Sequence, residues 1–408
     1  MPERSDIAVV GGGAAGLVAA VSGARRGAAV KVLERLPRAG KKLLATGGGR
    51  SNLLNENLAA SAFTSTDPGL VASVLDRFGK TEIRTFFEDL GLRLKTEEDG
   101  RVYPATNQAS SVLKVLEIEA GRLGISVETG FEASGLASSS GGFSIAAADG
   151  RTVEARTVIL AGGGRSYPAL GSNGSCYGLA GRFGHSLVPP VPSAVPLLAK
   201  DGMCHFLQGQ KLRARISSLI DGRVGRTAEG ELLFTQYGLS GTAALDVSEG
   251  LSIAINREGK KDAAVIVDLV PFMSEEDLAA ELSRRGEAGW VAKDFGAGLL
   301  PEKFALVMPQ FVRDAGATSG KVSPAGMARS LAAALKARKF AVQGTRGWNE
   351  AEFTSGGVDA REVKPRTLES KLWRGLYFAG EVLDVQGGRG GYNLAWAWAS
   401  GFVAGLTE

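Results

Sequence analysis

The sequence has few of the residues that build metal and dithiol sites. Its 408 residues include only two cysteines, Cys176 and Cys204, and only two histidines, His185 and His205. The two cysteines form no CxxC motif, so neither a dithiol redox centre nor a zinc ribbon is supported. With two histidines, a histidine-rich metal site is implausible. We therefore expect no metal site.

Long apolar runs are also missing. The longest, such as AVIVDLV at 264–270, are far shorter than the ~20 residues that a membrane-spanning helix needs. The N-terminal stretch MPERSDIAVV lacks the basic, then apolar, then small-residue order of a secretory signal. These absences favour a cytoplasmic protein that does not bind a membrane.

The charge balance excludes little. There are 47 basic and 43 acidic residues, a net charge of +4 with a pI of about 9.0. The charges are spread along the chain, which is typical of a solvated surface, although an anionic partner stays open. Hydrophobic residues make up 44% and charged residues 22%, the composition of a globular protein. The length suggests two or three domains.

Glycine is the abundant residue. The chain has 57 glycines, about 14% of its residues where ~7% is average. They follow no collagen period and form no glycine–serine linker. Instead they gather in four clusters, and these clusters indicate the function.

The first cluster opens the chain. A β-like run at 7–10 precedes GGGAAG, a helical pattern follows, and a second β-like run ends at Glu34. This is the G-x-G-x-x-G dinucleotide motif in its βαβ context. Gly11 would make the tight turn, Gly13 would let a pyrophosphate approach the backbone, and Gly16 would let helix and strand pack. Glu34 would bind a ribose diol and repel a 2′-phosphate, so FAD or NAD fits better than NADP.

The second and third clusters favour FAD. GKKLLATGGGRSNLLN, at 40–55, could lay backbone amides and Arg50 or Asn52 along a long ligand, an extension that an ordinary dehydrogenase does not need. In the third cluster, AGGG follows a strand at 158–161, but Tyr167 holds the place of the third fingerprint glycine, followed by Pro168. We therefore exclude a separate nicotinamide domain and expect the chain to return to the first domain here.

The fourth cluster lies near the C-terminus, at 375–405. The strand LYFA meets a Gly–Glu pair, and a helix begins at about Tyr392. Glu381 or Asp384 could bind a ribityl hydroxyl. The amides at 390–394, which open the helix, could face the negative charge of a reduced flavin, so the helix dipole would favour the reduced state.

Four segments together, GGGAAGL, GKKLLATGGGRSN, GGGRSYPALGS and FAGEVLDVQGGRGGYN, resemble the YhiN/BaiN-type bacterial flavoprotein family, also described as aminoacetone-oxidase-like FAD-binding enzymes and NAD(P)/FAD-dependent oxidoreductases. The resemblance covers nearly the whole chain. It implies non-covalent FAD and an α/β fold: a Rossmann-type, glutathione-reductase-like FAD-binding domain at 1–192 and 351–408, an inserted β-rich domain at 193–270 and 338–350, and a small helical domain at 271–337.

The resemblance also implies which residues bind the cofactor. The matching positions are Gly11, Gly13, Gly16, Glu34, Lys42, Thr46, Gly47, Gly48, Arg50, Asn52, Gly162, Gly163, Gly380, Glu381, Asp384, Gly391 and Asn393; we add their neighbours Ala15, Arg35, Ala161 and Leu394. The chain departs from the family pattern in RSN, where Ser51 replaces a cysteine, in GSNGSCY, which replaces GSTGDGY, and at Arg389, which replaces a threonine. The substrate of a relative is therefore a poor guide to the substrate of this chain.

The middle of the chain fits the inserted domains. The proline-rich stretch 188–196 resists helix and could serve as a hinge. Three segments, LRARISSLI, ELLFTQYG and LSIAINRE, are expected to be strands. From Ser274, an N-cap followed by acids, the pattern is helical, and MARSLAAALKARK is an amphipathic helix. The stretch ASGLASSSGG, at 133–142, is expected to be a hairpin tip.

The substrate pocket is predicted at the flavin. Its candidate lining residues are Tyr167, Arg389, Tyr392 and 355–357. Tyr167 or Tyr392 could give a proton while the flavin gives a hydride to a C=C or C=N bond, and Arg389 could clamp an anionic group. Each tyrosine could equally be a packed ring, and Arg389 a surface residue.

Three functions are consistent with these residues. The leading one is an FAD-dependent oxidoreductase that reduces an unsaturated small molecule with NADH or NADPH, docked transiently, or oxidises an amine with oxygen. The alternative is an enzyme that reduces uridine in ribosomal RNA, an activity associated with part of the family, motivated by the basic stretches KLRAR at 211–215 and KARK at 336–339. The third, a binding module that has lost its flavin, is disfavoured by the intact motifs.

Overall fold

The computed structural model describes residues 5–139, 141–317 and 324–407. The chain divides into two compact units, Met1–Pro190 with Phe353–Glu408, and Val191–Glu352. Each unit has its own hydrophobic core. The second unit is therefore an insertion in the first. Its further division into a β-rich and a helical domain stays a prediction.

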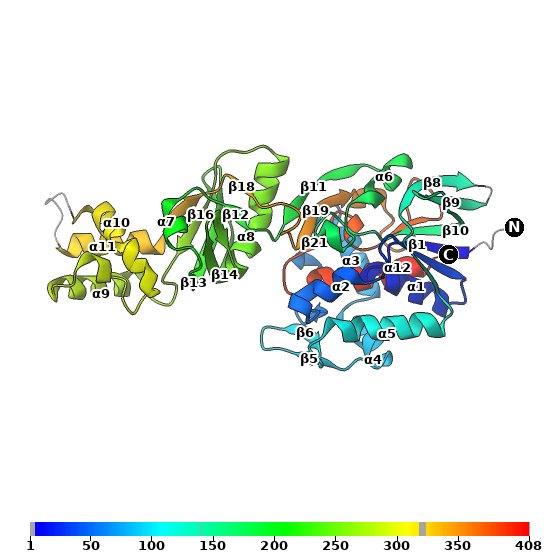
Figure 1. Ribbon diagram of the computed structural model, residues 1–408, viewed down its shortest axis with the longest axis horizontal. Helices are drawn as coiled ribbons and strands as arrows, with labels where there is room; N and C mark the ends of the chain where they lie inside the picture. Colours follow the sequence, from blue (N-terminus) through cyan, green and yellow to red (C-terminus); the bar gives the residue numbers. More distant parts are fainter. Residues whose placement is uncertain (1–4, 140, 318–323, 408) are drawn as a thin grey trace. The chain divides into compact units, whose positions relative to one another are not determined.

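The first unit is built on a seven-stranded mixed sheet in the order β7-β2-β1-β10-β9-β8, with β20 paired to β10 (Figure 1). Strands β7, β2, β1, β10 and β20 are parallel, and β9 and β8 are added antiparallel. The strands are β1 (Ser5–Val10), β2 (Val30–Glu34), β7 (Ser126–Thr129), β8 (Ala133–Ser139), β9 (Gly142–Ala147), β10 (Thr152–Leu160) and β20 (Leu376–Phe378). The predicted α/β fold with a Rossmann-type sheet is confirmed, and β10 returns to the first sheet as expected.

Two helices from opposite ends of the chain pack closely on each other, α1 (Ala14–Arg25) and α12 (Tyr392–Gly405). A Cβ atom at Gly401 would lie 2.3 Å from the carbonyl oxygen of Ala15, and one at Gly405 would lie 2.4 Å from that of Ala19. Only glycine lets the backbones approach this closely. The contact therefore joins the first and fourth glycine clusters in one core.

Smaller elements surround this core. They are α2 (Lys41–Ala45), β3 (Leu54–Asn55), β4 (Phe63–Ser65), α3 (Pro68–Arg77), α4 (Lys80–Asp89), β5 (Leu94–Thr96), β6 (Arg101–Pro104), α5 (Ala109–Arg122), α6 (Ser175–Arg182), β11 (Leu187–Ser193), β19 (Phe353–Val358) and β21 (Val385–Gly387). The pairs β11–β19 and β21–β4 form two-stranded sheets, and β3, β6 and β5 form a third small sheet. The proline-rich stretch thus begins in an extended strand.

The second unit holds a seven-stranded sheet in the order β17-β16-β13-β14-β15-β12-β18. Its neighbouring strands are antiparallel, and buried residues alternate along β13, as expected for a sheet covered on one face. The elements are β12 (Leu197–Leu198), α7 (Gly202–Phe206), β13 (Lys211–Ile220), β14 (Arg223–Thr235), β15 (Gly238–Ser240), α8 (Thr242–Ser252), β16 (Ala263–Asp268), α9 (Glu275–Glu287), α10 (Met308–Val312), α11 (Pro324–Lys336), β17 (Arg338–Ala341) and β18 (Gly344–Thr345).

Some local expectations were wrong. LSIAINRE is not a strand, because α8 and the π-helix Ile253–Arg257 cover it. A short apolar run is compatible both with the two-residue repeat of a strand and with the 3.6-residue repeat of a helix. Val247, Leu251 and Ala254 are buried at helical spacing, and this burial favours the helix. The stretch at 133–142 is mostly strand β8 rather than hairpin tip, and α11 ends at Lys336, before the predicted ARK, which enters β17.

In the part of the chain that the structure describes, no helix is long and apolar enough to cross a membrane.

Candidate functional site

Strand register brings the four glycine clusters to one edge of the first sheet. Val10, the last residue of β1, is paired with Leu33 of β2 and with Leu160 of β10, and Leu160 is paired with Phe378 of β20. The segments that follow these strands therefore leave the sheet side by side. The carboxyl edge of a parallel sheet, at a crevice between strands, is where such folds bind nucleotides. We take this edge as the candidate site.

The fingerprint glycines are required for two different reasons. Gly11 has a φ of +110°, and a Cβ there would lie 2.5 Å from the carbonyl oxygen of Ala161. A Cβ at Gly16 would lie 1.9 Å from the carbonyl oxygen of Gly11. The fold itself therefore demands these two glycines. At Gly13, φ is −81° and a Cβ would meet no described atom within 4 Å, its chain neighbours aside.

Gly13 is the N-cap of α1, and among the described residues no side chain caps this helix. Any residue could adopt the backbone conformation of Gly13, but the side chain of another residue would partly fill the open space beside it. We call this space the cradle at the start of α1. Backbone N–H groups and the positive end of the helix dipole face such a space, which suits a pyrophosphate. The residues present thus fit a dinucleotide cofactor.

The acid at the end of β2 is held toward the same loop. Glu34 is 7% exposed; its Oε2 accepts from the Gly12 N–H at 2.8 Å, and its Oε1 accepts from the Leu36 N–H at 2.8 Å. Each carboxylate oxygen can accept a further bond, so a ribose diol could bind there. The neighbouring Arg35 donates to the Gly171 carbonyl at 3.4 Å and pairs with Glu132.

A polar network joins the second, third and fourth clusters. Lys42 Nζ, from α2, lies 2.7 Å from Glu381 Oε2 and 2.8 Å from Ser166 Oγ. Glu381 Oε1 also accepts from the Thr354 N–H at 2.7 Å. The Thr354 hydroxyl in turn accepts from the backbone N–H groups of Arg165 and Ser166. The network fixes the turn after β10 against the turn after β20.

Ser166 and Thr354 were missed as site residues, although Ser166 lies in the motif GGGRSYPALGS and Thr354 directly precedes the predicted lining segment 355–357. Their signal was local: each directly adjoins a glycine cluster. Lys42 and Glu381 were both predicted, but 339 positions separate them in the sequence, so their pairing could only come from the fold.

Asparagines hold the C-terminal glycine loop. Asn393 accepts from the Gly387 N–H at 2.9 Å and donates to the Gly387 carbonyl at 2.8 Å. Asn55, which sequence reasoning missed, donates to the Gly390 carbonyl at 2.8 Å. The Asn52 amide, oriented to satisfy both neighbours, accepts from the Gly391 N–H and donates to the Leu54 carbonyl, each at 3.1 Å. The loop that opens α12 is therefore rigidly positioned.

Other predicted residues face protein atoms. Arg50 pairs with Glu97, donates to Asn107 and lies 4.0 Å from the Tyr103 ring centroid; the hydrogen bond with Glu97 raises the pKa of Arg50. Thr46 donates to the Leu43 carbonyl, and Asp384 accepts from the Thr66 N–H. Their contacts with a cofactor stay predictions.

The remaining predicted cofactor positions lie in the turns after β10 and β20, in the 3-10 turn Thr46–Gly49, and at the starts of α1 and α12. The N–H of Ala161, the residue directly after β10, donates to the Val10 carbonyl. Gly47 and Gly48 have φ of +58° and +66°, a conformation that favours glycine. These positions are Ala15, Gly47, Gly48, Ala161, Gly162, Gly163, Gly380, Gly391 and Leu394.

The predicted catalytic residues lie in the segment after β10 and in the loop that opens α12. Tyr167, half-buried, has a φ of +53° and precedes a 3-10 turn; Tyr392, half-buried, begins α12 with its ring edge-on to Phe63 at 6.1 Å. Arg389 is half-buried in the glycine loop. The segment 355–357 lies buried at the end of β19. Their catalytic roles stay predictions.

Two buried hydroxyls in these motifs have no hydrogen-bond partner in residues 5–139, 141–317 and 324–407: those of Ser51 and Tyr177. Ser51 is fully buried with a φ of +58°. Buried polar groups normally find a partner, so each such atom requires an explanation. Neither residue was predicted to act in the site, although the departures RSN and GSNGSCY pointed to both segments. Cys176, beside Tyr177, is buried, and burial raises its thiol pKa to about 12, so it stays protonated.

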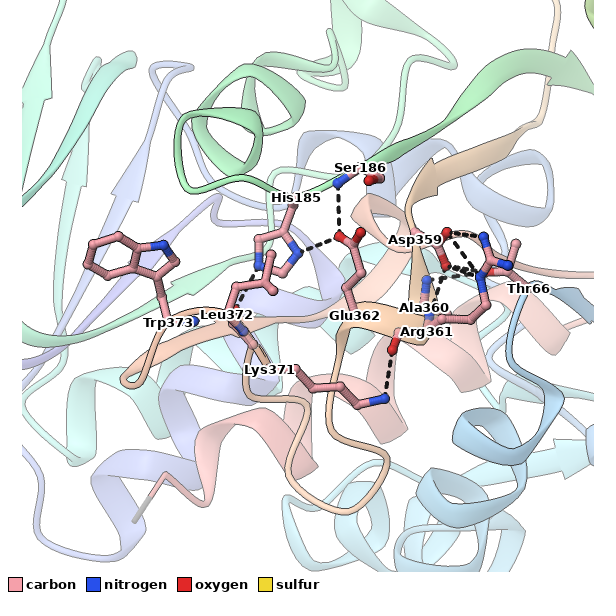
Figure 2. Close-up of polar contacts among 11 residues, drawn as sticks. Thr66, His185, Ser186, Asp359, Ala360, Arg361, Glu362, Lys371, Leu372 and Trp373 are labelled. Carbon is pink, nitrogen blue, oxygen red and sulfur yellow. Dashed lines mark hydrogen bonds and ion pairs between the residues drawn. The ribbon is translucent and has the colours of Figure 1, made fainter.

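In the cluster around His185, by contrast, the polar side chains find their hydrogen-bond partners among protein atoms (Figure 2). The Ser370 hydroxyl accepts from the backbone N–H groups of Leu372 and Trp373. It must therefore donate its proton to His185 Nε2, 2.8 Å away, which leaves the His185 Nδ1–H to donate to Glu362 at 3.2 Å. Burial lowers the pKa of His185, so the ring is neutral. We assign this cluster a structural role.

Comparison with known proteins identifies the family of this chain. The family model described as the HI0933-like protein Rossmann domain matches residues 5–407. The chain is 38% identical to a 3-dehydro-bile acid delta(4,6)-reductase of Clostridium scindens over 98% of both chains. It is 29% identical to a ribosomal RNA dihydrouridine synthase of Escherichia coli over 98% of this chain and 97% of that one.

Solved structures share the fold. A 3-ketosteroid-delta4-(5alpha)-dehydrogenase of Rhodococcus jostii is similar with a TM-score of 0.50 and 16% identity, covering 99% of this chain and 97% of that one. At this identity the likeness concerns the fold alone.

Proposed function

The chain belongs to the HI0933-like family of FAD-dependent oxidoreductases, and from that premise we propose that it reduces a C=C bond conjugated to a ring ketone, with NADH or NADPH as the electron donor. The observation that carries the proposal is the 38% identity, over 98% of both chains, to a reductase whose name specifies 4,6-unsaturated 3-dehydro-bile acids.

Bound FAD would supply the hydride. This chain's own residues would do the rest: the glycine turns after β1, β10 and β20 would hold the cofactor, and the N-terminus of α12 would stabilise negative charge beside it. Either Tyr167 or Tyr392 would give a proton to the substrate. Arg389 would bind an anionic group of the substrate, such as a side-chain carboxylate. A nicotinamide donor would dock transiently, since the third cluster lacks the full fingerprint.

The test begins with the visible spectrum of the purified protein. A flavin spectrum that NADH or NADPH bleaches without oxygen, and that a 3-keto-4,6-diene steroid acid then restores, is the expected result. The matched control is the saturated 3-ketone, which should leave the flavin reduced. Bleaching by an amine instead, or reduced flavin that the diene does not reoxidise, would contradict the proposal.

Tyrosine variants separate the proton donors. Replacing the true donor by phenylalanine, in Tyr167→Phe or Tyr392→Phe, should lower kcat by about 10²–10⁴-fold while bleaching by the nicotinamide stays unchanged. If neither variant slows product formation, both residues are packed rings.

Reduction of uridine in ribosomal RNA is the second candidate, favoured by the names of the 29% identical relatives. Most cations of the two basic stretches that motivated it are paired with acids. Lys211 pairs with Glu231, and Arg213 and Arg215 both pair with Glu229. Likewise Lys336 pairs with Asp268, and Arg338 with Asp201. Paired cations offer less to a phosphate backbone, so the steroid-type substrate is the better proposal. Unchanged dihydrouridine in ribosomal RNA of a deletion strain would exclude the RNA function.

A further inference from the structure

Arg101, the first residue of β6, lies against the C-terminal glycine loop. In the antiparallel pair of β3 and β6 it is directly opposite Asn55, whose side chain donates to the Gly390 carbonyl at 2.8 Å. Residues directly opposite each other in such a pair carry their side chains on the same face. A Cβ at Gly390 would lie 3.5 Å from Arg101 Nε and 3.8 Å from a ring carbon of Tyr392. Arg101 therefore borders the loop that opens α12.

The surroundings of Arg101 are open rather than enclosed. Its side chain is 38% exposed, and Arg389, Gly390 and Tyr392 of the loop are also half-buried. Arg389 and Tyr392 are two of the residues predicted to line the substrate pocket. Arg101, which comes from a segment distant in the sequence, would border that same pocket.

The guanidinium of Arg101 keeps its donors available for a ligand. Its ion pair is with Asp99, whose Oδ2 lies 3.3 Å from Nε, and the Asp99 side chain is 52% exposed. An ion pair this exposed is weak. In residues 5–139, 141–317 and 324–407, the Arg101 side chain donates no hydrogen bond. Its terminal nitrogens can therefore bind a group that reaches the loop.

The chemical group that fits these donors is a carboxylate. The planar fork of an arginine matches the two oxygens of a carboxylate with two parallel hydrogen bonds. The proposed substrate, a steroid acid, carries such a group on an apolar ring system. Arg389, which adjoins Gly390 in the chain, was predicted to bind the same kind of group, so two cations border one loop.

We propose that Arg101 binds the carboxylate of the substrate and makes the enzyme selective for steroid acids over uncharged steroids. The proposal rests on the proposed function and deepens it, because it names a residue that selects the substrate class. Arg101 fixes one end of the substrate and takes no part in hydride or proton transfer. It therefore acts on substrate binding and not on the chemical step.

The test compares a 3-keto-4,6-diene steroid acid with the corresponding alcohol, in which a hydroxymethyl group replaces the carboxylate. In Arg101→Met we expect KM for the acid to rise about 10- to 100-fold, as for the loss of hydrogen bonds to a charged group, with kcat and KM for the alcohol unchanged. The dissociation constant of the saturated acid, followed by the flavin absorbance of the oxidised holoenzyme, should rise equally.

The matched control is Arg93→Met. Arg93 is an exposed arginine directly before β5, the strand paired with β6. It lies beside the far end of β6, where its carbonyl accepts from the Ala105 N–H. We expect wild-type constants for both compounds in this variant.

Asp99→Asn separates substrate binding from a structural role. If Arg101 served only to pair with Asp99, removing either partner would change the kinetics alike. In the proposed role the two variants act in opposite directions: Asp99→Asn should lower KM for the acid about twofold, because it removes a competing carboxylate.

Two results would overturn the inference and leave the proposed function intact: an Arg101→Met enzyme that keeps the wild-type preference for the acid, or an Asp99→Asn enzyme whose KM for the acid rises as in Arg101→Met. A wild-type enzyme that reduces neither compound would overturn both proposals, so the two failures are distinguishable.

Discussion

The two units of this chain use their polar groups differently. In the second unit, residues singled out in the sequence are satisfied by their neighbours: Ser274 accepts from the Asp277 N–H at 3.0 Å to cap α9, and Lys336 lies 2.8 Å from Asp268 and donates to two carbonyls. In the first unit, Gly13 borders open space and the Tyr177 hydroxyl lacks a partner among the described residues. Ser274 and Lys336 are thus satisfied by protein atoms, whereas Gly13 leaves room for a ligand; buried polar atoms without a described partner occur in both units, since the Arg338 Nε of the second unit is another.

This difference separates two kinds of glycine that a motif search treats alike. Gly16 is required by the Gly11 carbonyl, an atom of the protein. No described atom beyond its chain neighbours requires a glycine at Gly13, and we propose that this glycine leaves room for the cofactor. Geometry can therefore identify which motif positions serve the fold and which serve the cofactor.

The largest expected effect is a loss of FAD affinity on substitution of Gly13. In Gly13→Val the side chain would fill the cradle at the start of α1, so FAD affinity should fall about 100-fold or more, ~2.7 kcal/mol, while the free energy of unfolding without flavin changes by less than about 1 kcal/mol. FAD titration and chemical denaturation measure the two. Gly16→Ala is the control and should instead destabilise the flavin-free protein by about 3 kcal/mol. Equal losses of stability in both variants would refute the distinction.

A matched pair of lysines sharpens the comparison. Lys42→Met breaks the pair with Glu381 in the first unit, and Lys336→Met breaks the pair with Asp268 in the second. Each should cost about 2 kcal/mol of unfolding free energy, because a partly buried carboxylate loses its counter-ion. Only Lys42→Met should also lower the amount of flavin that copurifies, measured by absorbance. Flavin loss in both variants would mean that general destabilisation is the cause.

A pH series compares a buried carboxylate with a partly exposed one. Hydrogen bonds from Arg122 and then Arg25 lower the pKa of Glu119 to about 2, although burial opposes them. Its stabilisation is therefore present above the unfolded pKa of about 4.5 and is lost as the pH falls from about 5 to about 2. Glu119→Gln should cost about 2 kcal/mol at pH 7, and this cost should shrink as the pH falls and vanish below the folded pKa of about 2.

The control for this series is Glu281→Gln in the second unit. Glu281 also has a pKa lowered to about 2 by hydrogen bonds from Arg284 and Arg285, but its side chain is 23% exposed where that of Glu119 is 8%. Solvent screening makes an exposed pair worth less, so this variant should lose less stability. Denaturation curves at several pH values check both, and a larger loss for Glu281→Gln would contradict the argument.

The smallest expected effect lies at the cap of α9. Ser274→Ala should cost about 1 kcal/mol because the Asp277 N–H loses its acceptor, and it should leave FAD retention unchanged. Thermal unfolding and flavin content measure the two. Loss of flavin in this variant would show that the units do not behave independently.

Local chemistry made much of this protein predictable. The strand–glycine–helix pattern at 7–34, the N-cap at Ser274 and the start of α12 depend on neighbours in the sequence, and the structure has all of them. The strand prediction for LSIAINRE was wrong because a short apolar run is compatible with both strand and helix periodicity. The packing of α8 on the sheet decides between the two. Ser166, Thr354 and Asn55 were missed because their partners are distant in the sequence.

The sequence by itself determined the family and the fold class, and it predicted the segments that would face a dinucleotide, because those depend on glycine spacing and on an acid at the end of a strand. Only the tertiary structure decided how these segments meet. It paired Lys42 with Glu381, set three asparagines against one loop, and left the Tyr177 hydroxyl without a described partner. The physical reason is that register and side-chain satisfaction are long-range properties, whereas turns and helix starts are local ones.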